Sequence, residues 1–272
     1  MKINKTTLFF AFILAFALWY FIVYKKEMSK ALSGEFPIPG VENEHIIWGY
    51  PVSSNDKIYR YKGLVLGYNE KRKNPDWVSY HITKEYISGK KFLDKRKFKS
   101  DPTIEDRSRV RTSDYTNSGY DRGHLAAQAD MRGRDLQCES ESCYLTNIAP
   151  QKPDFNRKTW LNLENAVRKW TEKYGESWVL AGTIYDDQST FIKEKIEIPD
   201  AFYKIIIIND GNSFISNSFV IYQDNSSYNL EEYIVSIDSV EKATGIDFFS
   251  ELEDGLEDNF ESRVNRVLVG WR

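Results

Sequence analysis

The sequence has few residues of the kinds that build metal clusters. Among 272 residues there are only two cysteines, Cys138 and Cys143, and three histidines. No further cysteine and no paired histidine lies near the two cysteines, so they do not form a zinc site. The chain also has no internal repeat, no low-complexity tract, and no recognition helix, zinc finger or RNA-binding motif. These absences argue against a protein that reads base sequence.

Positive charge is scarce in the C-terminal part of the chain. Residues 210–262 carry one lysine against thirteen acidic residues, whereas residues 84–134 carry thirteen lysines and arginines against eight acidic residues. The formal net charge of −3 and the pI of about 5.8 therefore conceal a local basic region. Such a region is compatible with a phosphate-containing substrate, although both regions could also be ordinary solvated surface.

Charge is absent from residues 6–24, an apolar run that contains several aromatic residues. A helix of this length rises about 28 Å, close to the hydrocarbon thickness of a bilayer. We therefore expect residues 1–27 to form an N-terminal membrane anchor, with a cleaved signal peptide as the alternative. Residues 28–44 read as a linker. The flanking lysines are too evenly distributed to set the orientation of the anchor.

Apolar periodicity predicts one α+β domain over residues 45–272, with an antiparallel sheet and a helix packed on it. The helix is expected at 157–174, because apolar residues repeat there at three- and four-residue spacing and Gly175 ends the pattern. Residues 205–208 lack alternation, which indicates a strand buried on both faces. Strands are expected at 64–68, 77–82, 178–185, 202–208 and 214–222, and a short helix from a capping box at 238–241 to Gly245.

The stretch from Tyr120 to Glu164 concentrates residues suited to phosphate chemistry. The motif DRGH at 121–124 places an imidazole beside a guanidinium, and Asn147, Asn156 and Glu164 follow. His124, with an unperturbed pKa near ~6.5, is largely neutral at pH 7 and can take a proton from water. A base, a cation, a neutral oxygen ligand and a carboxylate together suit a metal-assisted attack on phosphate.

This stretch also resembles a known family, the DNA/RNA non-specific endonucleases of the ββα-metal (His-Me finger) class, which includes mitochondrial endonuclease G. The matching segments are DRGHLA at 121–126, TNIAPQ at 146–151 and FNRKTWLNLE at 155–164, in the order of the family. The resemblance implies the ββα-metal fold and endonucleolytic hydrolysis of DNA and probably RNA. Because relatives include dimers, it also implies a possible homodimer.

The resemblance further implies a role for each motif residue. His124 is expected to be the general base, Asn156 the ligand of one hydrated Mg²⁺ ion, with Mn²⁺ as a substitute, and Glu164 the holder of a metal-bound water. Asn147 is expected to support the site by hydrogen bonding. Contacts to the substrate phosphate are implied for three arginines, Arg96, Arg122 and Arg168.

Two features suggest a compartment outside the cytoplasm. A non-specific nuclease in the cytoplasm would attack the nucleic acids of the cell, so we expect a periplasmic or extracellular domain, secreted if the N-terminal segment is cleaved. Cys138 and Cys143 lie in an expected polar loop and could form a short disulfide in such a compartment, or could remain two reduced thiols.

Two other functions stay open. One is a catalytically inactive member of the family that binds nucleic acid or a partner at the membrane; the intact set of His124, Asn156, Glu164 and Arg122 argues against it. The other is an enzyme that cleaves a small phosphodiester or a nucleotide. The basic region at 84–134 argues against it, because it favours a polymeric substrate.

Overall fold

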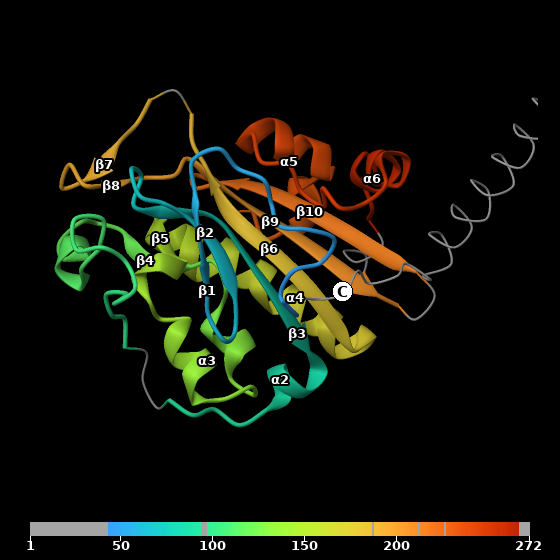
Figure 1. Cartoon of the computed structure of the whole chain (residues 1–272), viewed down its shortest axis with the longest axis horizontal. Coiled ribbons are helices and arrows are strands. Elements are labelled where there is room, and N and C mark those ends of the chain that lie inside the picture. The colour runs from blue at the N-terminus through green and yellow to red at the C-terminus, as the bar shows by residue number, and fades with distance from the viewer. Residues whose placement is uncertain (1–42, 94–96, 187, 211–212, 226, 267–272) are drawn as a thin grey trace, which may run out of the picture.

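The computed structural model describes residues 43–93, 97–186, 188–210, 213–225 and 227–266 of the chain. Its centre is a seven-stranded antiparallel sheet with the strand order β1-β2-β3-β6-β9-β10-β11 (Figure 1). The strands are β1 (Lys57–Arg60), β2 (Val65–Asn69), β3 (Asn74–Thr83), β6 (Glu176–Ile184), β9 (Ala201–Asn209), β10 (Phe214–Tyr222) and β11 (Ile234–Val235). The predicted anchor at 1–27 lies outside the described residues.

The predicted hairpin at the start of the sheet is confirmed. Strand β2 pairs with β3 in antiparallel register, and the register shifts between Gly67 and Tyr68. At the shift the indole of Trp77 packs directly on Gly67, where an added Cβ would lie 2.3 Å from Trp77 Nε1. Only a glycine leaves room for this close approach of the buried indole.

Strand β9 is buried on both faces, as the run of four isoleucines predicts. It pairs with β6 along one edge and with β10 along the other. Ile206 and Ile208 belong to the core on one face of the sheet, and Ile205 and Ile207 belong to the core on the opposite face. A strand of this kind is buried only if both faces of the sheet are covered, and here a hydrophobic core lies on each face.

Helix α4 (Leu161–Tyr174) provides the main cover of the first face. Its buried side chains Leu163, Val167 and Trp170 pack in the same core as Ile206. The predicted apolar face is thus confirmed, and the helix ends at Gly175, whose φ of 101° few other residues adopt. The start differs from the prediction, because Phe155–Trp160 form a π-helical turn ahead of α4.

The opposite face is covered by α5 (Ile237–Thr244) and α6 (Asp254–Glu261) (Figure 1). The predicted short helix is α5, but it begins earlier than expected. Ser236 is the N-cap, accepting a hydrogen bond from Ser239 N, so the capping box expected at 238–241 does not start the helix. It ends at Gly245 as predicted. Helix α6 was not foreseen from the sequence.

A separate two-stranded unit lies beside α4. Strand β4 (Asp121–His124) pairs with β5 (Ile148–Gln151) in antiparallel register, so that two of the three family-like segments adjoin each other. The remaining elements are short: α2 (Lys84–Ser88), α3 (Leu136–Glu141), β7 (Phe191–Ile192), β8 (Ile196–Glu197), and 3-10 turns at Thr112–Tyr115, Gln128–Met131, Leu145–Asn147 and Leu230–Tyr233.

The possible disulfide is contradicted by the structure. Cys138 and Cys143 are both free and both buried. The segment expected to be a polar loop contains helix α3, capped by the side chain of Asp135. Cys138 lies on this helix, whereas Cys143 comes after its C-cap, Ser142. Cys138 packs in the core, and Cys143 Sγ lies 3.8 Å from the backbone oxygen of Glu139.

We expect the mass of the purified chain to be the same before and after treatment with reductant. Under denaturing conditions without reductant, an alkylating agent should modify both thiols, and it should modify one in a Cys138→Ser control. A chain that is lighter by two hydrogens before reduction, and whose thiols both resist alkylation, would show that the disulfide is present.

Candidate active site

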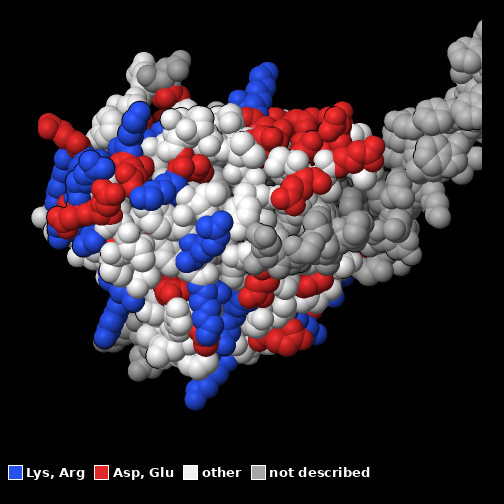
Figure 2. All heavy atoms as spheres, viewed as in Figure 1, with Lys and Arg blue, Asp and Glu red and all other residues white. Residues whose placement is uncertain are grey.

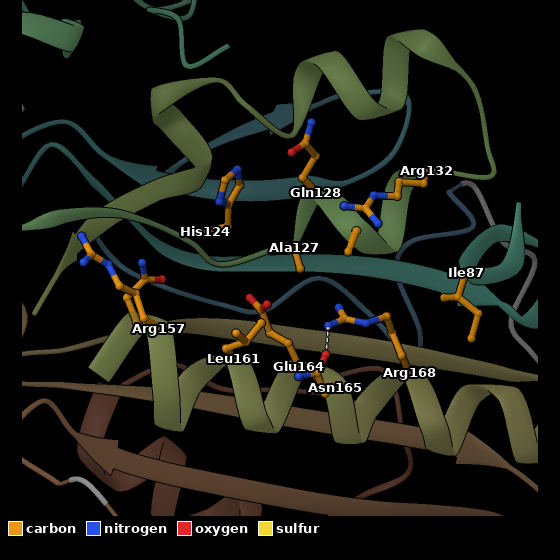
Figure 3. Close-up of a pocket in the computed structure, with 12 residues that line it drawn as sticks. Ile87, His124, Ala127, Gln128, Arg132, Arg157, Leu161, Glu164, Asn165 and Arg168 are labelled. Carbon is orange, nitrogen blue, oxygen red and sulfur yellow. Dashed lines mark hydrogen bonds between the residues drawn. The ribbon is translucent and has the colours of Figure 1, made fainter. Parts of the chain in front are cut away.

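One pocket of about 630 Å³ lies between the segment from His124 to Arg132 and the π-helical turn with helix α4. Figure 3 shows side chains entering it from two sides, with His124 and Gln128 on one side and Glu164 and Arg168 from α4 on the other. Asn156 also lines it. The structure therefore brings together four residues that the sequence placed in the site, His124, Asn156, Glu164 and Arg168.

The backbone that follows His124 is held by side chains from three different elements. Trp160 Nε1 donates to His124 O at 3.1 Å, Lys204 Nζ donates to Leu125 O at 3.2 Å, and Asn147 Nδ2 donates to Ala126 O at 2.9 Å. Three consecutive carbonyls are thus fixed where the chain turns away from β4. Buried carbonyls need such partners, and here the partners also determine where the imidazole lies.

Asn147 is a clamp on the backbone and does not line the pocket. Its Oδ1 accepts from Ala126 N at 2.9 Å, and its Nδ2 also donates to Ser142 O at 2.8 Å. The side chain is almost completely buried. This geometry agrees with the supporting role that the resemblance implies for Asn147.

The π-helical turn sets the relation between Asn156 and Glu164. Eight residues of regular α-helix rotate a side chain by about 800°, which leaves the two positions about 80° apart. A π-helical turn takes up one additional residue, and this brings the pair to within about 20° of each other. Both side chains consequently line the same pocket.

Asp121, the first residue of the DRGH motif, orients Asn156 and Arg157. Its carboxylate accepts from Asn156 Nδ2 at 2.9 Å and from Arg157 Nε and Nη2 at 2.8 and 2.7 Å. Burial raises the pKa of Asp121, but the hydrogen bonds from Arg157 and Asn156 outweigh it and leave the pKa below its usual value. Sequence reasoning missed this role, although the aspartate stands inside the motif.

Arg168 lines the pocket but already has a carboxylate partner. Its Nη1 donates to the buried Asp130 at 2.7 Å, and its Nη2 donates to Asn165 at 2.6 Å. Asp130 also accepts from the hydroxyl of Tyr80 at 3.1 Å. A substrate phosphate would have to share this guanidinium with Asp130.

Arg122 lies beside the pocket and is not among the residues that line it. Its Nη2 donates to Thr112 O at 2.8 Å, and its guanidinium carbon lies 5.6 Å from the ring centre of Phe98. The ring of His124 lies on the same phenyl group at 5.1 Å. Arg122 and His124, two residues apart on β4, therefore share one neighbour. Arg96 lies outside the described residues.

Two arginines that the sequence reasoning did not select also line the pocket, Arg132 and Arg157. Within the described part of the chain, no hydrogen bond or ion pair joins Arg132 to another residue, and its buried Nε has no partner. The only signal for Arg132 in the sequence was the local excess of basic residues, which does not single out one side chain.

Lys204 lies completely buried on β9, beneath the site. Its Nζ is 4.5 Å from the ring centre of Trp160, in addition to its bond with Leu125 O. Burial lowers the pKa of Lys204 to about 8, although the carboxylates of Glu164 and Asp130 oppose this shift. The negative charges of Glu164 and Asp130 therefore favour the charged form of Lys204, and burial opposes it.

With this geometry in place, comparison with known proteins identifies the class of protein. The family model for DNA/RNA non-specific endonucleases matches residues 41–255, and the chain belongs to this family. It is therefore a member of a family of nucleases, enzymes that hydrolyse nucleic acids.

Several individual nucleases are similar to the chain. It is 28% identical to the mitochondrial nuclease EXOG of Danio rerio over 76% of this chain and 64% of that protein. It is 30% identical to the nuclease of Serratia marcescens over 78% of this chain and 81% of that protein. A chain from the crystal structure of the EndoG/EndoGI complex has 30% identity and a TM-score of 0.68, covering 76% of this chain and 90% of that chain.

The predicted location is corrected by these comparisons. The EXOG relative and the endonuclease G of Caenorhabditis elegans are both named as mitochondrial, which contradicts a membrane-anchored domain outside the cytoplasm. Among the described residues no helix is long and apolar enough to cross a bilayer, and residues 6–24 are not among them. The prediction depended on an apolar run, and hydropathy alone does not specify a compartment.

The buried charge of Lys204 gives a prediction about pH. The unfolded lysine has a pKa near ~10.4, so between about pH 8 and 10 the unfolded state binds more protons than the folded state. The free energy of unfolding should therefore rise with pH in this window, and fall as pH drops towards 8. Between about pH 8 and 10, we expect the free energy of unfolding of wild type to increase by on the order of 2 kcal/mol more than that of Lys204→Met.

Denaturant unfolding at several pH values measures this difference. Lys169→Met, which removes an exposed lysine on α4, is the matched control and should run parallel to wild type. Parallel curves for wild type and Lys204→Met would show that Lys204 does not titrate in this window.

Proposed function

We propose that the chain cuts DNA and RNA internally and without sequence preference, with one Mg²⁺ ion, or Mn²⁺ as a substitute, at the pocket shown in Figure 3. The observation that carries this proposal is the convergence of an imidazole, an amide, a carboxylate and several guanidinium groups on one pocket. Membership of the endonuclease family supports the reaction class. The order of the three segments also supports a ββα-metal arrangement of β4, β5 and α4.

The donor atoms in the pocket suit a hard divalent cation. Asn156 uses its Nδ2 to bond Asp121, so its amide oxygen is not engaged in that contact. This oxygen and, through a water, the carboxylate of Glu164 would hold the ion. Two protein donors are few, which suits Mg²⁺, because it keeps several waters and takes further oxygens from substrate phosphate. When bound, the ion would supply Lewis-acid polarisation of the phosphate.

His124 serves as the general base in this proposal. Its imidazole takes a proton from the attacking water, the water oxygen bonds to phosphorus, and the bond from phosphorus to the 3′-oxygen breaks. The three hydrogen bonds to residues 124–126 hold the backbone that carries the ring. Proton transfer is sensitive to such placement, because the base must stay within hydrogen-bond reach of the water.

Arginines at the pocket supply contacts to the substrate phosphate. Arg132 and Arg157 line it directly, and Arg168 can contribute while it remains paired with Asp130. Arg122 would contact phosphate groups that extend past Phe98. Contacts to phosphate carry no base information, so cleavage without sequence preference follows. The role of Arg96 and a homodimer remain predictions.

The first experiment incubates the full chain with closed-circular plasmid and with RNA, in Mg²⁺ or in EDTA. We expect nicking of the circle in Mg²⁺ only, and a loss of at least about 100-fold in rate for His124→Ala. His81→Ala is the matched control, because His81 bonds Glu176 on the sheet and does not line the pocket.

Each of the other outcomes has a definite meaning. Near-normal nicking by His124→Ala would remove His124 as the base. Cleavage of a small phosphodiester without nicking of the circle would favour the small-substrate enzyme. Retention of DNA without cleavage, by folded chain in Mg²⁺, would favour the inactive binding protein.

A second experiment tests the metal ligand. Asn156→Ala should raise the Mg²⁺ concentration needed for half-maximal cleavage by about tenfold or more, because the amide oxygen is lost. Asn162→Ala, on the following helix α4, is the control, since Asn162 Nδ2 donates to Tyr228 O and Asn162 does not line the pocket. A Mg²⁺ titration of cleavage rate that is unchanged in Asn156→Ala would exclude Asn156 as a ligand.

A further inference from the structure

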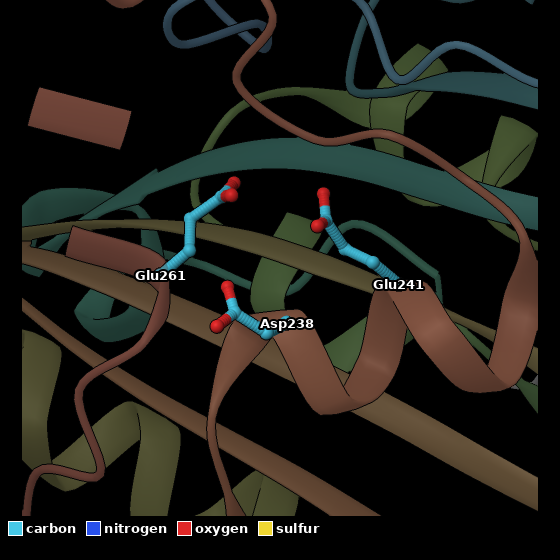
Figure 4. Close-up of side chains that lie close together, drawn as sticks. All are labelled: Asp238, Glu241 and Glu261. Carbon is cyan, nitrogen blue, oxygen red and sulfur yellow. The ribbon is translucent and has the colours of Figure 1, made fainter. Parts of the chain in front are cut away.

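Three carboxylates converge on the far side of the sheet from the pocket. Asp238 and Glu241 project from α5, and Glu261 projects from the last turn of α6 (Figure 4). One oxygen from each side chain lies within 4.8 Å of the oxygens of the other two. Exposed acidic groups often gather in this way without a ligand, so the burial of Glu261 is the informative feature.

Glu261 is only 5% exposed. Its buried Oε1 has no hydrogen-bond partner, and the buried Oε1 of Glu257, one turn earlier on α6, has none either. A carboxylate removed from water costs free energy unless a donor or a cation compensates it. In the part of the chain that the structure describes, no lysine or arginine forms an ion pair with Glu261, Asp238 or Glu241.

The charges around Glu261 increase this cost. The carboxylates of Glu241, Glu257, Asp238 and Asp247 repel a negative charge on Glu261. Figure 2 shows acidic side chains gathered over the part of the surface where Figure 1 places α5 and α6. A group of this kind either shares a proton or binds a cation.

We propose that Asp238, Glu241 and Glu261 bind a Ca²⁺-class divalent cation that fastens α6 to α5. Ca²⁺ takes oxygen ligands at about 2.3–2.6 Å, so two of its ligands can lie up to about 5 Å apart, and the observed spread fits. The three ligands are all carboxylates, which is the donor type that hard cations select.

The cation would stabilise the packing of α6. Phe260, the neighbour of Glu261, is buried against Trp48 and Phe249, with ring centres 5.2 and 6.1 Å away. These rings belong to the core on the face of the sheet opposite α4, so the site is distinct from the catalytic pocket. Its role is structural and does not depend on the proposed nuclease activity.

The test uses the full chain carrying Asn156→Ala, so that binding of cations at the catalytic pocket is weakened. After removal of metal with EDTA and dialysis, Ca²⁺ is added in a calorimetric titration and in thermal unfolding. We expect about one Ca²⁺ per chain and a Tm that rises with Ca²⁺ concentration. Adding Glu261→Gln should weaken Ca²⁺ binding at least tenfold and abolish the rise in Tm.

Asp258→Asn is the matched control, because Asp258 is an exposed acid on α6 outside the cluster, and it should keep the rise. Asp238→Asn, at an exposed ligand, should weaken binding even if Glu261→Gln fails to fold. The proposal is overturned if Ca²⁺ does not bind the Asn156→Ala chain, or raises the Tm of the Glu261 variant equally. A Tm raised by Glu261→Gln alone, with no response to Ca²⁺, would instead show a shared proton.

Discussion

Three successive hydrogen bonds to the carbonyls of residues 124–126 connect the parts of this structure that matter for its chemistry. Their donors come from the π-helical turn, from strand β9 of the sheet and from the turn before β5. Each donor belongs to a different layer, so the imidazole is placed by the whole domain and not by its own strand alone. A site held in this way keeps its geometry only while the helix, the sheet and the β4–β5 unit remain packed together.

The central sheet also separates two electrostatic environments. Arginines gather at the pocket on the α4 side, and carboxylates gather over α5 and α6 on the other side. A polyanionic substrate is attracted to the first surface and repelled by the second, so the net charge of −3 does not describe what the substrate meets. The acidic face therefore favours one orientation of nucleic acid on the molecule.

Much of this arrangement could be predicted from the sequence, because local patterns fix it. The apolar face of α4, the run of isoleucines in β9 and the hairpin of β2 and β3 each follow from periodicity, and the structure confirms them. The loop expected around Cys138 was wrong because the segment forms helix α3, on which Cys138 and the polar Glu139 are both buried. Helix α6 was not predicted, because its sequence is rich in acidic residues and only one aromatic residue, Phe260, packs it against the core.

The site contains contacts that a sequence motif does not predict. A motif gives the identity of a side chain and its position along the chain, but not the partner that the side chain meets after folding. Arg168 and Arg132 are both cations of the same pocket, yet Arg168 is paired with a buried aspartate while Arg132 has no such partner among the described residues. The ion pair with Asp130 offsets part of the positive charge that would otherwise attract a phosphate. It joins two residues that are 38 positions apart in the chain. The free energy with which each arginine would bind phosphate is therefore set by tertiary structure, even where the sequence supplies the arginine.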